Sequence, residues 1–157
     1  MAKGSLKLII AETPANPTAA IVDLDLMVRI ADEIGAKQGN RPLVVVDNTL
    51  LGPFAQRPIA HNVDLCMTSL TKYCGGHSDL LAGGISGRKE LIEQLKLQRT
   101  TWGNHLDPFT AWLVLRSLES VSVRTERAMS NARLVAEYLR DHPKVAGVTY
   151  LGFLPEG

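Results

Sequence analysis

The sequence predicts an α/β fold in which helices flank a mostly parallel sheet. The first half of the chain alternates short apolar runs, typical of strands, with a segment whose apolar residues recur at helical spacing. One run, residues 43–46, is continuously apolar and mostly β-branched, as expected for a strand covered on both faces. Strands that alternate with helices in this way favour a parallel sheet.

The first expected strand and helix carry clear local signals. Residues 6–11 form an apolar-rich run that ends in a turn. Residues 22–37 form the helix, with Asp23 and Asp25 in its first turn, where carboxylates suit the helix dipole, and with Gly39 closing it. The apolar positions of this helix are Val22, Leu26, Ile30 and Ile34, with Met27 and Ala31 beside them.

The later elements follow the same rules. Residues 63–68 are a further strand candidate, and residues 80–85 are a weaker one because they contain glycines. Helices are expected over 88–98, 107–118 and 123–140, the second with Asp107 as its cap and Pro108 at its first position. A last strand is expected over 145–150. No repeat or long linker interrupts the sequence, so we treat residues 1–157 as one unit.

Composition and charge exclude several classes of function. The chain has 157 residues and a net charge of +1, which gives no electrostatic reason to expect nucleic acid or an anionic membrane as a partner. No run approaches the roughly 18 apolar residues of a membrane span. The two cysteines are expected to be reduced thiols, and a cytoplasmic location is expected. The glycine-rich motifs of nucleotide-binding domains do not occur where a strand meets a helix.

Polar residues cluster where a ligand is expected. Parallel sheets bind ligands at the carboxyl ends of their strands, so functional residues are expected just after Ile10, Val46 and Thr68. The segments at these places are Glu12-Thr13-Pro14-Ala15-Asn16-Pro17, Asp47-Asn48-Thr49 and Ser69-Leu70-Thr71-Lys72-Tyr73.

Each of these residues also has an ordinary structural explanation. Asp47 could cap a turn, Lys72 could be a solvated charge, and Asn16 could be a turn residue. Together they meet the requirements of pyridoxal 5′-phosphate (PLP). This cofactor needs a lysine amine for a Schiff base, a carboxylate facing its pyridine nitrogen, and hydroxyl and N–H donors for its phosphate.

Longer motifs around these residues resemble one family. The lysine segment continues into Cys74-Gly75-Gly76-His77-Ser78-Asp79, and with Gln56-Arg57-Pro58 it resembles the signature of the Cys/Met-metabolism family of PLP enzymes. That family contains cystathionine γ-synthase, cystathionine γ- and β-lyases and methionine γ-lyase. Nearly the whole chain takes part in the resemblance, including Leu113-Val114-Leu115-Arg116-Ser117-Leu118 and Tyr150-Leu151-Gly152-Phe153-Leu154-Pro155.

The resemblance implies a role for each site residue. Lys72 would bind PLP covalently and act as general acid and base. Asp47 would pair with the pyridine nitrogen, and Thr49 would lie near a face of the ring. Asn16 would bond the phenolic oxygen, and Ser69 and Thr71 would contact the phosphate.

Several other residues are interpreted as structural. Cys74 and His77 could be half of a metal site, but the further ligands that zinc requires are missing, so no metal is expected. The glycines between them are expected to allow a tight turn. Arg116 and Arg124 are interpreted as structural ion-pair residues and are not placed in the site.

The resemblance also implies that parts of the family's fold are missing. Family members are longer, with an N-terminal arm, a glycine-rich phosphate loop and a stacking tyrosine before this region and a carboxylate-binding arginine after it. The chain is therefore expected to be part of the large domain of a fold-type I PLP-dependent transferase, truncated at both ends. A truncated gene product, an excised fragment and a re-used small protein all remain open.

Two functions follow from the resemblance. The first is a PLP-dependent lyase or transferase that acts by elimination or replacement on sulfur amino acids such as cystathionine or methionine, working as a homo-oligomer (dimer or tetramer). The second is a non-catalytic remnant or assembly module that keeps part of the PLP site.

Overall fold

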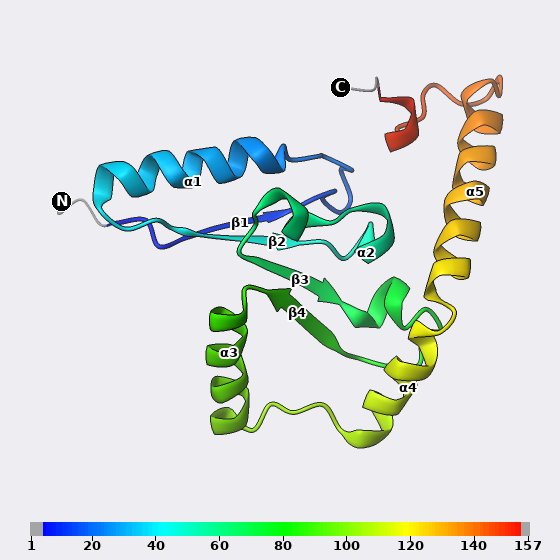
Figure 1. Cartoon of the computed structure of the whole chain (residues 1–157). Coiled ribbons are helices and arrows are strands. Elements are labelled where there is room, and N and C mark those ends of the chain that lie inside the picture. Colours follow the sequence, from blue (N-terminus) through cyan, green and yellow to red (C-terminus); the bar gives the residue numbers. More distant parts are fainter. Residues whose placement is uncertain (1–4, 155–157) are drawn as a thin grey trace.

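The computed structural model describes residues 5–154 and shows a small sheet with helices around it (Figure 1). Its strands and helices alternate in the first half of the chain, and helices follow in the second half. Besides short helical turns, the elements are β1 (Leu8–Glu12), α1 (Leu24–Gln38), β2 (Leu43–Asp47), α2 (Gly52–Ala55), β3 (Leu65–Ser69), β4 (Gly83–Gly87), α3 (Lys89–Trp102), α4 (Pro108–Leu118) and α5 (Val121–Arg140).

The sheet has the order β1-β2-β3-β4. β1, β2 and β3 run parallel, whereas β4 pairs antiparallel with β3. This confirms the predicted α/β class with a mostly parallel sheet. Glu12 at the end of β1 lies opposite Asp47 at the end of β2, so the carboxyl ends of these strands meet at one edge.

α1 covers β1 and β2 along most of their length (Figure 1). Asp23 caps the helix, because its carboxylate accepts a hydrogen bond from the backbone N of Leu26 at 2.9 Å. Gly39 ends it in the left-handed conformation, at φ 76°. The residues that pack against the sheet are Leu24, Met27 and Ala31, which form one core with Val44, Val46 and Val63.

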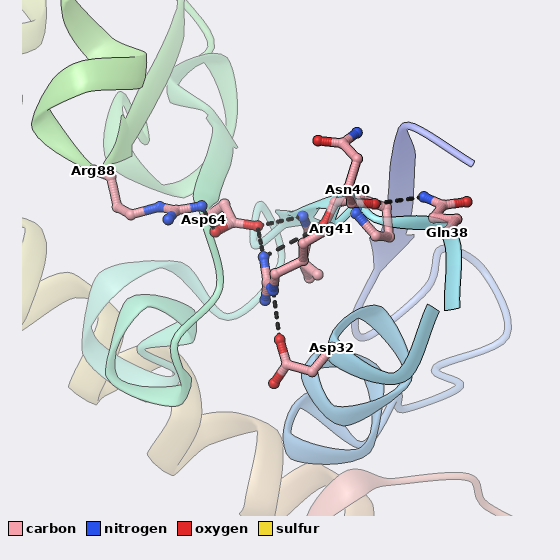
Figure 2. Close-up of polar contacts among 8 residues, drawn as sticks. Asp32, Gln38, Asn40, Arg41, Asp64 and Arg88 are labelled. Carbon is pink, nitrogen blue, oxygen red and sulfur yellow. Dashed lines mark hydrogen bonds and ion pairs between the residues drawn. The ribbon is translucent and has the colours of Figure 1, made fainter. Parts of the chain in front are cut away.

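A buried carboxylate, that of Asp64, lies at the end of the sheet opposite Glu12 and Asp47 and is bonded to residues of neighbouring segments (Figure 2). Asp64 accepts hydrogen bonds from Arg41 Nη1 and from the backbone N of Val44, both at 2.6 Å, and pairs with Arg88. Arg41 also pairs with Asp32 of α1 at 2.5 Å. Burial lowers the pKa of Arg41, but its hydrogen bonds to the two carboxylates outweigh burial, so the pKa is raised.

α4 covers the segment that follows the lysine. Its residues Leu113 and Val114 form a second core with Leu80, and Leu70 packs against that core. The predicted cap is confirmed, since Asp107 accepts from the backbone N of Thr110 at 2.9 Å. No helix within residues 5–154 is long and apolar enough to cross a membrane.

One predicted element was wrong, and two others have different bounds. Residues 145–150 form no strand, because the chain leaves the sheet along α5 and has no strand edge to pair with there (Figure 1). The strand expected over 80–85 begins only at Gly83, and Ala82 before it hydrogen-bonds Thr71 of the lysine turn. α3 continues to Trp102, beyond the expected end at residue 98. Pro155, the last residue of the resembling segment, lies outside the described residues.

Candidate functional site

All six residues predicted for the cofactor site line one open cavity of about 1220 Å³. The cavity lies at the carboxyl ends of β1, β2 and β3, as the parallel arrangement requires. Each strand end contributes polar groups to it. The predicted residues in its lining are Asn16, Asp47, Thr49, Ser69, Thr71 and Lys72.

Asp47 is held in place by its neighbour Thr49. One carboxylate oxygen of Asp47 accepts hydrogen bonds from the backbone N of Thr49 at 2.9 Å and from its hydroxyl at 2.5 Å. The Thr49 hydroxyl in turn accepts from the backbone N of Ser69 at 2.8 Å. The chain of bonds joins the ends of β2 and β3. Within residues 5–154, the second carboxylate oxygen of Asp47 has no hydrogen-bond donor from the protein, so it can accept one from a ligand.

Lys72 lies in a tight turn, Leu70–Cys74, that directly follows β3. The backbone leaves the helical path at Lys72, with φ −88° and ψ −116°. The turn is closed by bonds of 2.7 Å from Gly75 N to the Leu70 carbonyl and from Gly76 N to the Lys72 carbonyl. A Cβ on Gly75 would lie 2.8 Å from the Leu70 carbonyl oxygen. The predicted glycine-dependent turn is therefore confirmed.

The two predicted phosphate residues differ in their surroundings. The Thr71 hydroxyl accepts from Ala82 N at 3.0 Å and donates to the Ala82 carbonyl at 3.2 Å, so it joins the turn to the segment before β4. The Ser69 hydroxyl has no hydrogen-bond partner in the described part of the chain. The Ser69 hydroxyl is thus the one free to bind a phosphate. A phosphate contact by Thr71 would use a hydroxyl that already bonds the backbone of Ala82.

Asn16 lies in the turn that follows β1. Its backbone N donates to Glu12 Oε1 at 3.3 Å, and the buried Thr13 hydroxyl accepts from Val22 N at 3.0 Å. The Thr13-Pro14 and Asn16-Pro17 peptide bonds are cis. The side chain of Asn16 is exposed to the cavity and makes no hydrogen bond to another residue that the structure describes.

The two thiols and the histidine near the turn do not form a ligand cluster. Cys66 and Cys74 are free and buried, and burial raises the pKa of both thiols. His77 Nδ1 lies 2.7 Å from the carbonyl oxygen of Gly75, which ties the ring to the turn. Among the described residues, no group of three metal-ligating side chains comes together.

Two residues that support the site were missed from the sequence. Asn48 is buried, and its amide donates to the carbonyls of Gly52 and Gln56 at 3.0 and 2.9 Å, which shapes the loop after Asp47. Within residues 5–154 Arg124 forms no ion pair, and its guanidinium instead bonds the backbone carbonyls of Tyr73 and Cys74. No local signal points to these two contacts, which span 51 and 50 residues. Arg116 does pair with Asp79, at 4.0 Å.

The polar groups that line the cavity are of the kinds that PLP requires. It provides one primary amine from Lys72, one carboxylate oxygen from Asp47, one hydroxyl from Ser69 and one amide from Asn16, each without a hydrogen-bond partner elsewhere in residues 5–154. These groups match the aldehyde, the pyridine nitrogen, the phosphate and the phenolic oxygen in kind.

Comparison with known proteins gives the same family throughout. Residues 1–156 match the family described as Cys/Met metabolism PLP-dependent enzyme. The chain is 38% identical over 152 residues to an L-methionine gamma-lyase from Fusobacterium nucleatum, covering 96% of this chain and 37% of the relative. It is 39% identical over 147 residues to a cystathionine gamma-lyase from Bacillus subtilis, covering 93% and 37%.

Solved structures agree with these relatives. A methionine gamma lyase from Micromonospora echinospora superimposes with a TM-score of 0.87 at 39% identity, over 96% of this chain and 40% of that one. A cystathionine gamma synthase from Xanthomonas oryzae pv. oryzae gives a TM-score of 0.82 at 38% identity, over 88% and 35%. The chain thus spans well under half the length of the proteins that it matches.

Proposed function

The chain belongs to the Cys/Met metabolism family of PLP-dependent enzymes, and from this premise we propose that it carries the cofactor site of a lyase or transferase acting on sulfur amino acids. The observation that supports the proposal most strongly is the meeting of Lys72, Asp47, Ser69 and Asn16 at one cavity. These residues come from three different strand ends, so their meeting is a property of the fold and not of one short motif.

Each group has a defined task in the proposed site. Lys72 would hold PLP covalently through its amine, and the free oxygen of Asp47 would pair with the pyridine nitrogen. Ser69 and Thr71 would bind the phosphate, Asn16 would bond the phenolic oxygen, and Thr49, which fixes Asp47, would lie near the ring. When bound, PLP supplies a ring that withdraws electrons from the reacting carbon of an amino acid.

The chemistry left to the protein is proton transfer and positioning. Once the amino group of a substrate has displaced Lys72 from PLP, the free Lys72 amine would take a proton from the α-carbon of the substrate and return it later, as a general base and then a general acid. Asp47 keeps a proton on the pyridine nitrogen, because a carboxylate stabilises the positive charge there. We propose γ-elimination or γ-replacement on substrates of the cystathionine or methionine type.

Assembly and location are further parts of the proposal. Large apolar side chains are exposed on α3 and α4, with Trp102 79% and Phe109 67% exposed. Such surfaces favour association, so we propose a homo-oligomer, which light scattering would measure. Association without cofactor binding would instead support the assembly module. The two free thiols agree with a cytoplasmic location, which cell fractionation would test.

A titration with PLP tests the cofactor site. The visible absorbance of bound PLP is measured for the wild-type chain, for Lys72→Ala and for Lys96→Ala. Lys96 is the matched control, since it is an exposed lysine paired with Glu93 on α3. We expect the band in the wild type and in Lys96→Ala but not in Lys72→Ala. Equal bands in all three chains would rule out Lys72 as the cofactor lysine.

A further inference from the structure

One side chain from α5 reaches the turn that carries Lys72. The guanidinium of Arg124 donates from Nη1 to the carbonyl of Tyr73 at 2.8 Å and from Nη2 to the carbonyl of Cys74 at 3.0 Å. It also donates to the Ser117 carbonyl at 2.9 Å and to the Ser120 hydroxyl at 3.1 Å. Arg124 therefore joins the lysine turn to the end of α4 and the start of α5. Figure 1 shows α5 beyond the carboxyl ends of β1–β3.

The turn's own N–H groups serve only some of its carbonyls. The carbonyls of Leu70 and Lys72 accept from the backbone N of Gly75 and Gly76. The next two carbonyls, of Tyr73 and Cys74, accept from Arg124. Cys74 is only 4% exposed, so its carbonyl has little access to water. A planar guanidinium can serve both carbonyls at once, whereas a single ammonium cannot do so with the same geometry.

Gly76 provides the space in which the guanidinium lies. A Cβ at this position would lie 1.9 Å from Nη1 of Arg124, and the residue has φ +74°, a conformation that favours glycine. The local shape of the turn and the position of Arg124 are therefore matched to each other. Arg124 has no carboxylate partner among the residues that the structure describes, and its hydrogen bonds go to the turn, to Ser117 and to Ser120.

We propose that Arg124 is a positioning residue for Lys72. By holding the two carbonyls that follow the lysine, it fixes the backbone from which the Lys72 amine enters the cavity. The proposal rests on the proposed function, because Lys72 needs a fixed position only if it binds the cofactor. The effect on the backbone can nevertheless be measured without any cofactor.

Hydrogen exchange of the chain without PLP tests the effect on the backbone. The variants are Arg124→Ala and Arg124→Lys, and the control is Arg133→Ala, since Arg133 lies on the same helix in an exposed pair with Glu137. We expect the amides of Gly75 and Gly76 to exchange at least about tenfold faster in both Arg124 variants. The amide of Val46 in β2 should keep its wild-type rate, and the control should match the wild type throughout.

PLP binding tests the effect on the lysine. We expect the apparent dissociation constant to rise about tenfold in both Arg124 variants. We also expect the pH at which the visible absorbance of bound PLP changes to shift, because a displaced amine has different neighbours. The lysine variant should not restore the wild-type values. If the wild-type chain itself binds no PLP at Lys72, the proposed function fails, and the exchange measurement alone decides the role of Arg124.

Three results would overturn the proposal. The first is wild-type exchange at Gly75 and Gly76 in Arg124→Lys. The second is an equal loss of protection at Val46, which would make Arg124 a general stabiliser of the fold. The third is a loosened turn with unchanged PLP binding in a chain whose wild type binds PLP. If Arg124→Ala does not fold, Arg124→Lys decides by the same criteria.

Discussion

Replacement of Asp64 by alanine should destabilise the chain strongly. The carboxylate is 3% exposed and accepts from the backbone N of Val44, which alanine would leave without an acceptor. An orphaned buried donor costs about 1–3 kcal/mol. Arg41 and Arg88 would lose their shared partner, but they are 29% and 54% exposed and regain water, so their loss is smaller. With up to about 1 kcal/mol for each arginine, the sum is a loss of about 1–5 kcal/mol in the free energy of unfolding.

Urea unfolding followed by far-UV circular dichroism measures this loss. The matched control is Asp32→Ala, because Asp32 binds the same arginine but is 60% exposed. Its removal should cost about 0.2–1 kcal/mol. Asp64→Asn should lie between the two, since its amide oxygen can still accept from Val44. A loss below about 1 kcal/mol for Asp64→Ala, or equal losses for both alanine variants, would refute the reasoning that burial makes this carboxylate costly to remove.

Two further predictions concern the strand ends and the buried thiols. Thr49→Val removes the hydroxyl that joins Asp47 to Ser69, so we expect the affinity for PLP to fall about tenfold. Thr49→Ser keeps the hydroxyl and should keep the affinity. A wild-type affinity of the valine variant in an absorbance titration would contradict this expectation. Burial raises the pKa of Cys66 and Cys74 above 9.0, so their contribution to stability is complete below that pH and falls as the pH rises through 9.0 toward the folded-state pKa. Replacing both cysteines by alanine should flatten the fall in unfolding free energy between about pH 8.5 and 10, and an unchanged slope would count against it.

The sequence predicted the common position of the six candidate residues better than it predicted the edges of the fold. The six site residues meet because they follow parallel strands, and that rule needs only the strand positions. In α1 Gly39 was a local signal for the end of the helix and ends it as expected, whereas Asp23, expected in the first turn, is the N-cap. The buried face could not be chosen locally, since Leu26 and Ile30 are 45% and 42% exposed whereas Met27 and Ala31 are buried.

The missing strand, the direction of β4 and the role of Arg124 all depend on partners that are distant in the sequence. The apolar pattern of residues 145–150 suits a strand, but pairing depends on an available edge. The same holds for β4, whose antiparallel direction follows from its pairing with β3. Arg124 carries no mark of its role, because its partners are backbone carbonyls that any residue could supply. The Thr71 hydroxyl likewise bonds Ala82, a contact that only the folded turn creates.

Peptide mapping after borohydride reduction tests the cofactor site most directly. The chain is incubated with PLP, reduced and digested, and the mass of each lysine-containing peptide is measured. We predict that the added pyridoxyl group lies on the peptide with Lys72, and that Asp47→Asn lowers its yield at limiting PLP. An added group spread over exposed lysines such as Lys89 and Lys144, with no preference for Lys72, would contradict the proposed site.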